Sequence, residues 1–147
     1  MSHEDPAQAV AKGLKALDRD HVYLAMVCFE QAIRQERTPL TCSCLAYCLA
    51  KVRESYPEAV ALAREAISHE PENPTHYLNL GRIHILAKER KEALEVLRQG
   101  LQHEKSPEII RELEALGARK PAIFKGLSRR NPLNRWLGIL LDRLGMR

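Results

Sequence analysis

The chain has 147 residues, of which 45% are hydrophobic, 29% are charged and only 5% are aromatic. This length suits one ordinary domain with a real core, and the composition excludes a disordered or fibrous chain. The formal net charge of +4 is unevenly distributed, because residues 119–147 carry +7 and residues 1–118 carry −3. The sequence therefore predicts a mildly acidic body with a strongly basic tail.

The first ten residues are acidic and contain no signal peptide, and no stretch approaches the roughly 20 apolar residues that a membrane span needs. Of the four cysteines, Cys42, Cys44 and Cys48 crowd one short segment, which is a poor framework for disulfides. We therefore expect reduced thiols and a cytoplasmic protein, peripheral to a membrane if the tail binds lipid.

Three segments of the chain share one pattern: AMVCFEQAIRQE (25–36), AVALAREAISHE (59–70) and ALEVLRQGLQHE (93–104). Their first alanines are 34 residues apart, and each segment is small at its first and eighth positions and ends in glutamate. A second helical segment precedes each one, at residues 9–17, 44–52 and 77–87. Prolines mark the junctions, where a helix start tolerates them. The sequence therefore predicts a helix–turn–helix unit repeated three times.

This unit resembles the tetratricopeptide repeat, and the similarity covers roughly residues 6–107. The third unit is the best copy of the family pattern, through Tyr77, Leu80, Gly81, His84, Ala93, Leu97 and Gly100, with His84 in place of the usual tyrosine. The first unit matches through Gly13, Ala25, Phe29 and Ala32. The second unit matches through Leu45, Ala46, Ala59, Ala66 and Pro71, provided that its inter-helix turn gains one residue.

The residues after Pro107 predict a further helix that ends at Gly117. A solenoid needs such a cap, because its last unit otherwise exposes an apolar side. We therefore expect an all-α fold: an α-solenoid of three tetratricopeptide-type repeats, a capping helix and a C-terminal amphipathic helix. The repeat domain with its cap is expected at residues 1–118, and the basic linker with the amphipathic helix at residues 119–147.

The tail helix is predicted at residues 131–145, with Asn131-Pro132 as its start. Its apolar side chains form one stripe: Leu133, Trp136, Leu137, Leu140, Leu141 and Leu144. A helix of about twelve residues is marginal by itself in water, so we expect this stripe to dock on a surface. Three surfaces stay open at this point: the chain's own solenoid, an anionic membrane, and a partner protein or second copy.

Basic side chains precede the tail helix, at Arg119, Lys120, Lys125, Arg129 and Arg130. Near an anionic membrane each basic residue contributes about 1 kcal/mol, and a tryptophan suits the interface. The same residues would neutralise nucleic-acid phosphates. Nucleic acid is nevertheless the least favoured partner, because no interleaved aromatics or reading motif accompany them.

For catalysis the sequence offers no glycine-rich phosphate loop, no nucleophile elbow and no metalloprotease histidine pair. The cysteines lack the Cys-x-x-Cys pairs typical of zinc sites, and we expect them and the histidines to be structural. We therefore expect a non-enzymatic protein without a cofactor or metal.

The resemblance implies that the first helix of each unit lines a concave face. By position, the lining residues are Val10, Leu14, Leu17, Cys44, Tyr47, Leu78, Asn79, Arg82 and Ile85. Family members that grip the acidic C-terminus of heat-shock chaperones use a clamp of Lys, Asn and Arg. Here Val10, Leu14, Cys44 and Thr75 stand at most of those positions and only Asn79 fits, so we expect no such clamp.

The mostly apolar lining favours a helix or an apolar peptide as ligand. The simpler interpretation is that some of these residues pack within the helix pairs. The expected function is a protein–protein interaction module, acting as an adaptor, scaffold or assembly factor. The alternative function is a peripheral membrane-associated protein anchored by its tail.

Overall fold

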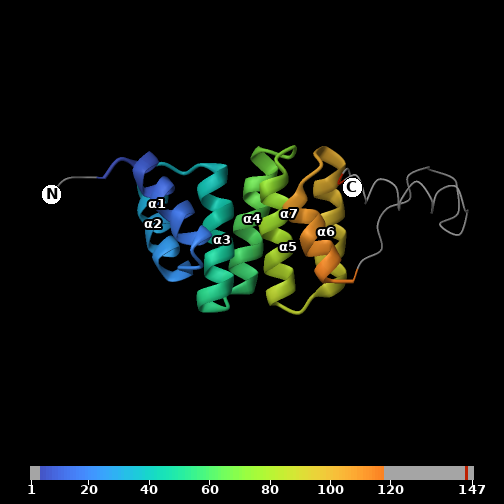
Figure 1. The fold of residues 1–147 in the computed structure, drawn as a ribbon. Helices are drawn as coiled ribbons and strands as arrows, with labels where there is room; N and C mark the ends of the chain where they lie inside the picture. The colour runs from blue at the N-terminus through green and yellow to red at the C-terminus, as the bar shows by residue number, and fades with distance from the viewer. Residues whose placement is uncertain (1–3, 118–144, 146–147) are drawn as a thin grey trace, which may run out of the picture. The chain divides into compact units, whose positions relative to one another are not determined.

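The computed structural model describes residues 4–117 and Gly145. Contacts divide the chain into residues 1–116 and 117–147, and the helices below belong to the first unit. These helices are α1 (Pro6–Asp18), α2 (Val22–Gln35), α3 (Pro39–Arg53), α4 (Tyr56–His69), α5 (Pro74–Leu86), α6 (Arg90–His103) and α7 (Pro107–Ala115) (Figure 1). The described part of the chain contains no strand, and none of its helices has an apolar stretch of the length that a lipid bilayer requires.

The first helix of each pair, and α7, begin at a proline that follows a capping side chain. The capping residues are Asp5, Thr38, Asn73 and Ser106, and each accepts a hydrogen bond from a backbone amide of the first turn. Proline suits this position because the first amides of a helix have no intrahelical partner. These local signals explain why the sequence marks the starts of α1, α3, α5 and α7 so clearly.

The turn inside each repeat contains one residue in the left-handed region. Asp20, Glu54 and Lys88 have φ values of 60°, 53° and 61°. They are spaced evenly by 34 residues, so the turns keep the period of the repeat. We expected the turn of the second unit to gain one residue, but it is one residue shorter than the other two turns. Helix α3 is instead two residues longer, with 15 residues against 13 for α1 and α5.

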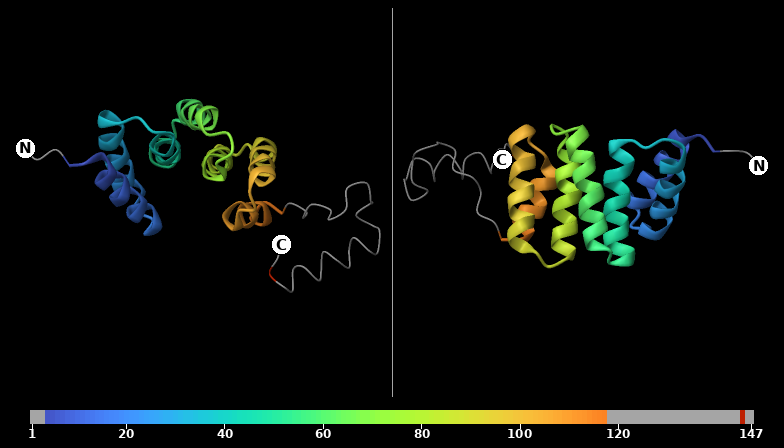
Figure 2. Two further views of the ribbon diagram at one scale, coloured as in Figure 1. Left: turned by 90° about the horizontal axis from the view of Figure 1, so that it is seen from above. Right: turned by 180° about the vertical axis from the view of Figure 1, so that it is seen from behind.

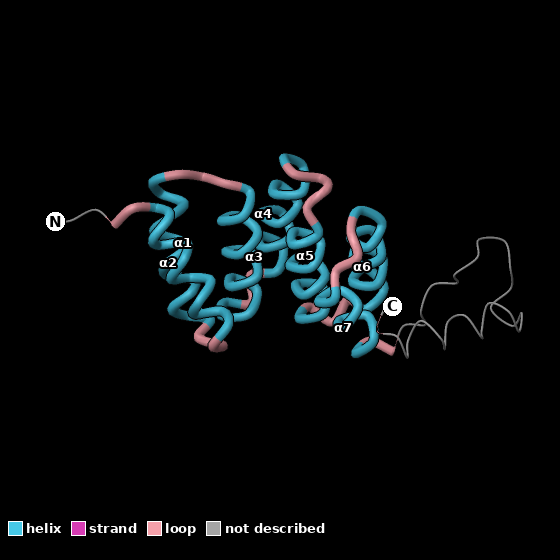
Figure 3. The backbone as a smooth tube through the Cα atoms, turned by 45° about the horizontal axis from the view of Figure 1, so that its top comes forward, coloured by secondary structure: helices cyan, strands magenta, loops and turns pink. Residues whose placement is uncertain are grey.

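The described helices form two rows, with α1, α3, α5 and α7 inside and α2, α4 and α6 outside (Figure 2). Short loops join them (Figure 3). Within a repeat the helices pack closely because a small residue lies under a large one. A Cβ added to Gly13 would lie 2.6 Å from Cε1 of Phe29, and one added to Gly81 would lie 2.6 Å from Cγ of Leu97. Both large side chains are fully buried.

Packing between neighbouring repeats is uneven. Helix α5 packs against α3, α4, α6 and α7, whereas α1 packs against α2 and has no comparable seam with α3. The inner helices α3 and α5 therefore pack directly on each other, whereas α1 and α3 make no comparable contact. The sequence did not predict this difference, since the repeat pattern is the same in both places.

The four cysteines are buried and unpaired, as expected for core filling. Burial raises the pKa of Cys44 to about 11 and that of Cys48 to about 12. The tail stripe of residues 133–144 and the basic side chains at 119–130 lie outside the described residues. Expectations about them stay predictions.

Candidate functional site

Two predicted groove residues meet where α3 and α5 pack together. Cys44 and Asn79 are buried there, and the predicted residue Leu78 on α5 is buried as well. The amide nitrogen of Asn79 donates a hydrogen bond of 2.8 Å to the hydroxyl oxygen of Ser43 on α3. A buried amide needs such a partner, and this one fixes the two inner helices side by side. These side chains therefore form the wall beneath the inner face.

Three other predicted residues occupy equivalent places along the inner row. Leu14, Tyr47 and Arg82 each directly follow the small residue at which their helix packs on its partner. Leu14 on α1 is 38% exposed, and Tyr47 and Arg82 are half-buried. This row places an aliphatic, an aromatic and a cationic side chain on consecutive inner helices.

Cations flank the ring of Tyr47 at the centre of the row. The guanidinium carbon of Arg82 lies 5.8 Å from the ring centroid, and the ammonium nitrogen of Lys51 lies 5.9 Å from it. These distances are within the range of a cation–π interaction. The Nε atom of Arg82 also donates a hydrogen bond of 2.8 Å to Glu112 on α7. At the centre of the inner face an aromatic ring thus lies near two cations, each of which is paired with a carboxylate, Arg82 with Glu112 and Lys51 with Asp20.

The remaining predicted residues are half-buried side chains of α1 and α5. Val10 and Leu17 on α1 are half-buried and pack against the core, and Ile85 on α5 is half-buried. Leu78 also reaches a hollow of about 430 Å³ between the N-terminal ends of α5 and α7, where Thr75 and Lys105 lie. The predicted groove residues thus divide into fully buried side chains and partly exposed ones.

Two features of this face and its surroundings escaped the sequence analysis. Lys51 follows Tyr47 by four residues, a spacing that puts both on one side of α3, so its role was detectable in principle. The other is an apolar patch on the outer helix α2, formed by Tyr23, Leu24 and Val27, of which Tyr23 is 67% exposed. Sequence alone assigns such residues to a repeat core as readily as to its surface.

In the described part of the chain, no group of three or more His, Cys, Asp or Glu side chains has the arrangement of a metal site. Among the described residues a thiol contacts a carboxylate at Cys42, whose Sγ lies 3.3 Å from Oε2 of Glu65. Burial raises the pKa of Cys42 to about 11, and Arg37 holds the same carboxylate through two hydrogen bonds. These groups tie α3, α4 and the loop before α3 together.

Comparison with known proteins places this architecture in a class. Residues 53–116 match the family model of the tetratricopeptide repeat. No curated protein sequence matches the chain. Similar solved structures include the TPR2B domain of yeast Sti1, with 24% identity, a TM-score of 0.61, and coverage of 76% of this chain and 91% of that one.

The TPR domain of Sgt2 from Aspergillus fumigatus is also similar, with 20% identity, a TM-score of 0.63, and coverage of 88% of this chain and 93% of that chain. The first TPR domain of Spaghetti (RPAP3) has 17% identity, a TM-score of 0.60, and coverage of 80% and 96%. The described helices therefore form an all-α helical-repeat solenoid. Residues 53–116 have the sequence pattern of the tetratricopeptide repeat, and the described helices share the fold of tetratricopeptide repeat domains.

Proposed function

We propose that the repeat domain is a non-enzymatic interaction module that binds a helix or an apolar peptide along its inner face. The observation that carries the proposal is the row of Leu14, Tyr47 and Arg82, exposed or half-buried on consecutive inner helices. Such a module would work as an adaptor, scaffold or assembly factor.

Two structural relatives support a peptide as the kind of ligand. The structure of the TPR2B domain of Sti1 is that of its complex with pHsp70. The structure of the first TPR domain of RPAP3 contains the bound Hsp90 peptide SRMEEVD. In this chain, Val10 and Leu14 present aliphatic side chains on α1, where a clamp for such acidic peptides needs polar groups. We therefore infer a ligand with an apolar face, which contacts Leu14 and stacks on Tyr47.

The test is a selection of binding peptides from a displayed library of amphipathic helices, followed by fluorescence anisotropy with the full chain. Leu14→Glu and Tyr47→Glu are expected to abolish binding, because each puts a charge against an apolar contact. Tyr23→Glu and Leu24→Glu on α2 are the matched controls, since they make the same changes on the outer row. Circular dichroism confirms that every variant is folded.

If binding survives Leu14→Glu and Tyr47→Glu in folded protein, the inner-face proposal is wrong. If Tyr23→Glu and Leu24→Glu abolish it instead, the α2 patch is the binding surface. A second domain copy is examined by size-exclusion chromatography over rising protein concentrations, since self-association would compete with the peptide.

A second candidate function is peripheral membrane binding through the tail, favoured by the charge of +7 and the apolar stripe in residues 119–147. Trp136 is the single tryptophan of the chain, so its fluorescence reports on the tail alone. A blue shift with anionic vesicles, and none with neutral vesicles, is the expected result for this function. An unchanged spectrum with both would exclude it.

A further inference from the structure

Helix α2 carries three large apolar side chains on its exposed side. Tyr23 is 67% exposed, Leu24 is 54% exposed and Val27 is 43% exposed. They lie within about one helical turn of one another and form a continuous surface, the α2 patch. The buried side of α2 packs on α1 and α3. Neither the inner face nor the tail accounts for the α2 patch.

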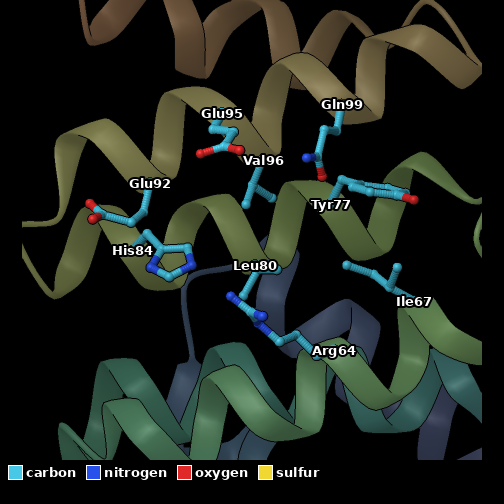
Figure 4. A pocket seen from close by; sticks show the side chains of 9 residues that line it. All are labelled: Arg64, Ile67, Tyr77, Leu80, His84, Glu92, Glu95, Val96 and Gln99. Carbon is cyan, nitrogen blue, oxygen red and sulfur yellow. The ribbon is translucent and has the colours of Figure 1, made fainter.

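The other two repeats show that the fold does not require apolar side chains at these positions. The equivalent positions are exposed there too, and they hold Pro57, Glu58 and Ala61 on α4, and Lys91, Glu92 and Glu95 on α6. On α6, Glu92 and Glu95 line a hollow of about 350 Å³, across which lie Arg64 and Ile67 of α4 (Figure 4). This side of an outer helix therefore faces the preceding repeat, and on α2 it lies at the end of the described outer row.

The two ends of the α2 patch carry opposite charges. Asp20 precedes Val27 by seven residues and Arg34 follows it by seven, about two helical turns on either side. The side chain of Asp20 is 84% exposed, and its Oδ1 lies 3.8 Å from Nζ of Lys51, a surface pair that contributes little. Arg34 is exposed and has no ion-pair partner among the described residues. A matching surface must therefore offer an apolar centre, a cation at one end and an anion at the other.

A second copy of this chain meets that requirement, because an antiparallel α2 carries the same patch with its end charges reversed. With Val27 at the two-fold axis, Asp20 of each copy lies opposite Arg34 of the other. A parallel arrangement would bring like charges together. An anionic lipid surface would match Arg34 and repel Asp20. We propose that two copies of the chain associate through α2 as an antiparallel, two-fold symmetric dimer.

The size of the contact determines the strength of this dimer. Helix α2 has 14 residues and is about 21 Å long. A contact along one helix of this length is at the small end of protein interfaces, so we expect a reversible dimer with a Kd of roughly 10–100 µM. The inner helices α3 and α5 take no part in it, and the proposal does not rest on the proposed function.

The test is sedimentation velocity of the full chain over rising protein concentrations, analysed as a monomer–dimer equilibrium. Val27→Glu is expected to raise the Kd at least about tenfold, because it places two carboxylates against each other at the axis. Ala61→Glu makes a change to the same residue at the equivalent exposed position of α4. It is the matched control and is expected to leave the Kd unchanged.

Reversal of the end charges tests the antiparallel arrangement. Arg34→Glu and Asp20→Lys are each expected to raise the Kd roughly three- to tenfold, because each replaces two attractive pairs with two repulsive ones. A lysine suits the left-handed turn at position 20, since Lys88 has a φ of 61° at the equivalent position. The double variant Asp20→Lys/Arg34→Glu is expected to restore the Kd of the unchanged chain.

A cysteine at the axis reports on the geometry directly. Val27→Cys is expected to form a disulfide between two copies under mild oxidation, because the two side chains meet at the axis. The four cysteines of the chain are buried, and Ala61→Cys is expected to stay monomeric under the same conditions.

The proposal is overturned if the full chain stays monomeric at concentrations above the expected Kd. It is also overturned if Val27→Glu, with native circular dichroism, dimerises as tightly as the unchanged chain, because self-association then uses another surface. Failure of the double charge variant to restore the Kd excludes the antiparallel pair. A monomeric chain in which Val27→Glu abolishes binding to anionic vesicles would assign the α2 patch to lipid instead. The inner-face proposal is tested separately, since Leu14→Glu and Tyr47→Glu are expected to leave the dimer unchanged.

Discussion

Helices α1 and α5 are inner helices of equal length, 13 residues each, yet their environments differ sharply. In α5 every residue from His76 to Gly81 is buried, whereas α1 buries only Ala9, Gly13 and Ala16. The cause is the number of neighbours, since four described helices surround α5 and α1 packs on one. In a repeat array, burial follows the place of a helix in the stack as much as its own sequence.

The largest expected difference between the two helices concerns the residue before each packing glycine. Leu80 on α5 is buried, and the equivalent Lys12 on α1 is exposed and paired with Glu4. Leu80→Ala is expected to lower the free energy of unfolding by about 2–5 kcal/mol, as for other buried leucines. Lys12→Ala is expected to leave it nearly unchanged. Urea denaturation measures both, and equal losses would contradict the comparison.

Substitutions at the packing glycines are expected to have similar effects in α1 and α5, because the contacts inside the first and third repeats are alike. An added Cβ at Gly13 would meet the Phe29 ring, and one at Gly81 would meet Leu97. Gly13→Ala and Gly81→Ala are each expected to cost about 1–3 kcal/mol from overpacking. Thermal unfolding checks this, and a well-tolerated Gly13→Ala would show that the first repeat is loosely packed internally as well.

The seam between α3 and α5 has a polar element that the first repeat lacks. Removing the amide of Asn79 leaves the Ser43 hydroxyl without its partner, so Asn79→Ala is expected to cost about 1–3 kcal/mol. Ser43→Ala combined with Asn79→Ala completes a double-mutant cycle. A coupling energy near zero would mean that this hydrogen bond does not hold the seam.

The smallest expected effect is kinetic and uses the buried thiols. Burial raises the pKa of Cys28 on α2 and, to about 12, that of Cys48 on α3, so native thiols react slowly with a thiol reagent at pH 8. Labelling then requires local opening. Cys28 is expected to react before Cys48. Its labelling rate exceeds that of Cys48 about tenfold for each ~1.4 kcal/mol by which the free energy of local opening is lower at Cys28. Mass spectrometry of digested samples identifies the labelled residue.

Simultaneous labelling of both thiols would show that the repeats open as one cooperative unit. In that case the uneven packing seen between α1 and α5 does not translate into graded stability. Cys48→Ala serves as the control, since the rate at Cys28 is expected to stay the same in its absence.

Much of the fold followed from local patterns in the sequence. The even spacing of Ala25, Ala59 and Ala93 indicated the period, and the prolines at 6, 39, 74 and 107 indicated where the inner helices begin. These signals act within a few residues, where propensity, capping and helix periodicity operate. The capping helix α7 was predicted for the same reason, since its apolar residues Ile109 and Leu113 are one turn apart and buried.

The candidate site was predicted less well, because it depends on how repeats tilt against one another. Position in the repeat placed Cys44 and Asn79 in the groove, but the close packing of α3 on α5 buries them. Leu14 was placed in the groove by the same reasoning, and its side chain stays partly exposed because α1 has no such seam with α3. The pocket under α4 and α6 arises from three separate helices, so no single stretch of sequence reveals it.

The left-handed residues Asp20, Glu54 and Lys88 have a consequence for the evolution and engineering of this chain. Each is a non-glycine residue with φ near +60° and is followed by a residue with φ between −83° and −100° and ψ between 66° and 69°, so the chain enters the second helix of every repeat in the same way. A segment copied from just after one of these residues up to the next would rejoin the chain with matching backbone direction. The solenoid is therefore built to be lengthened or shortened in whole cassettes of 34 residues, spliced at its turns.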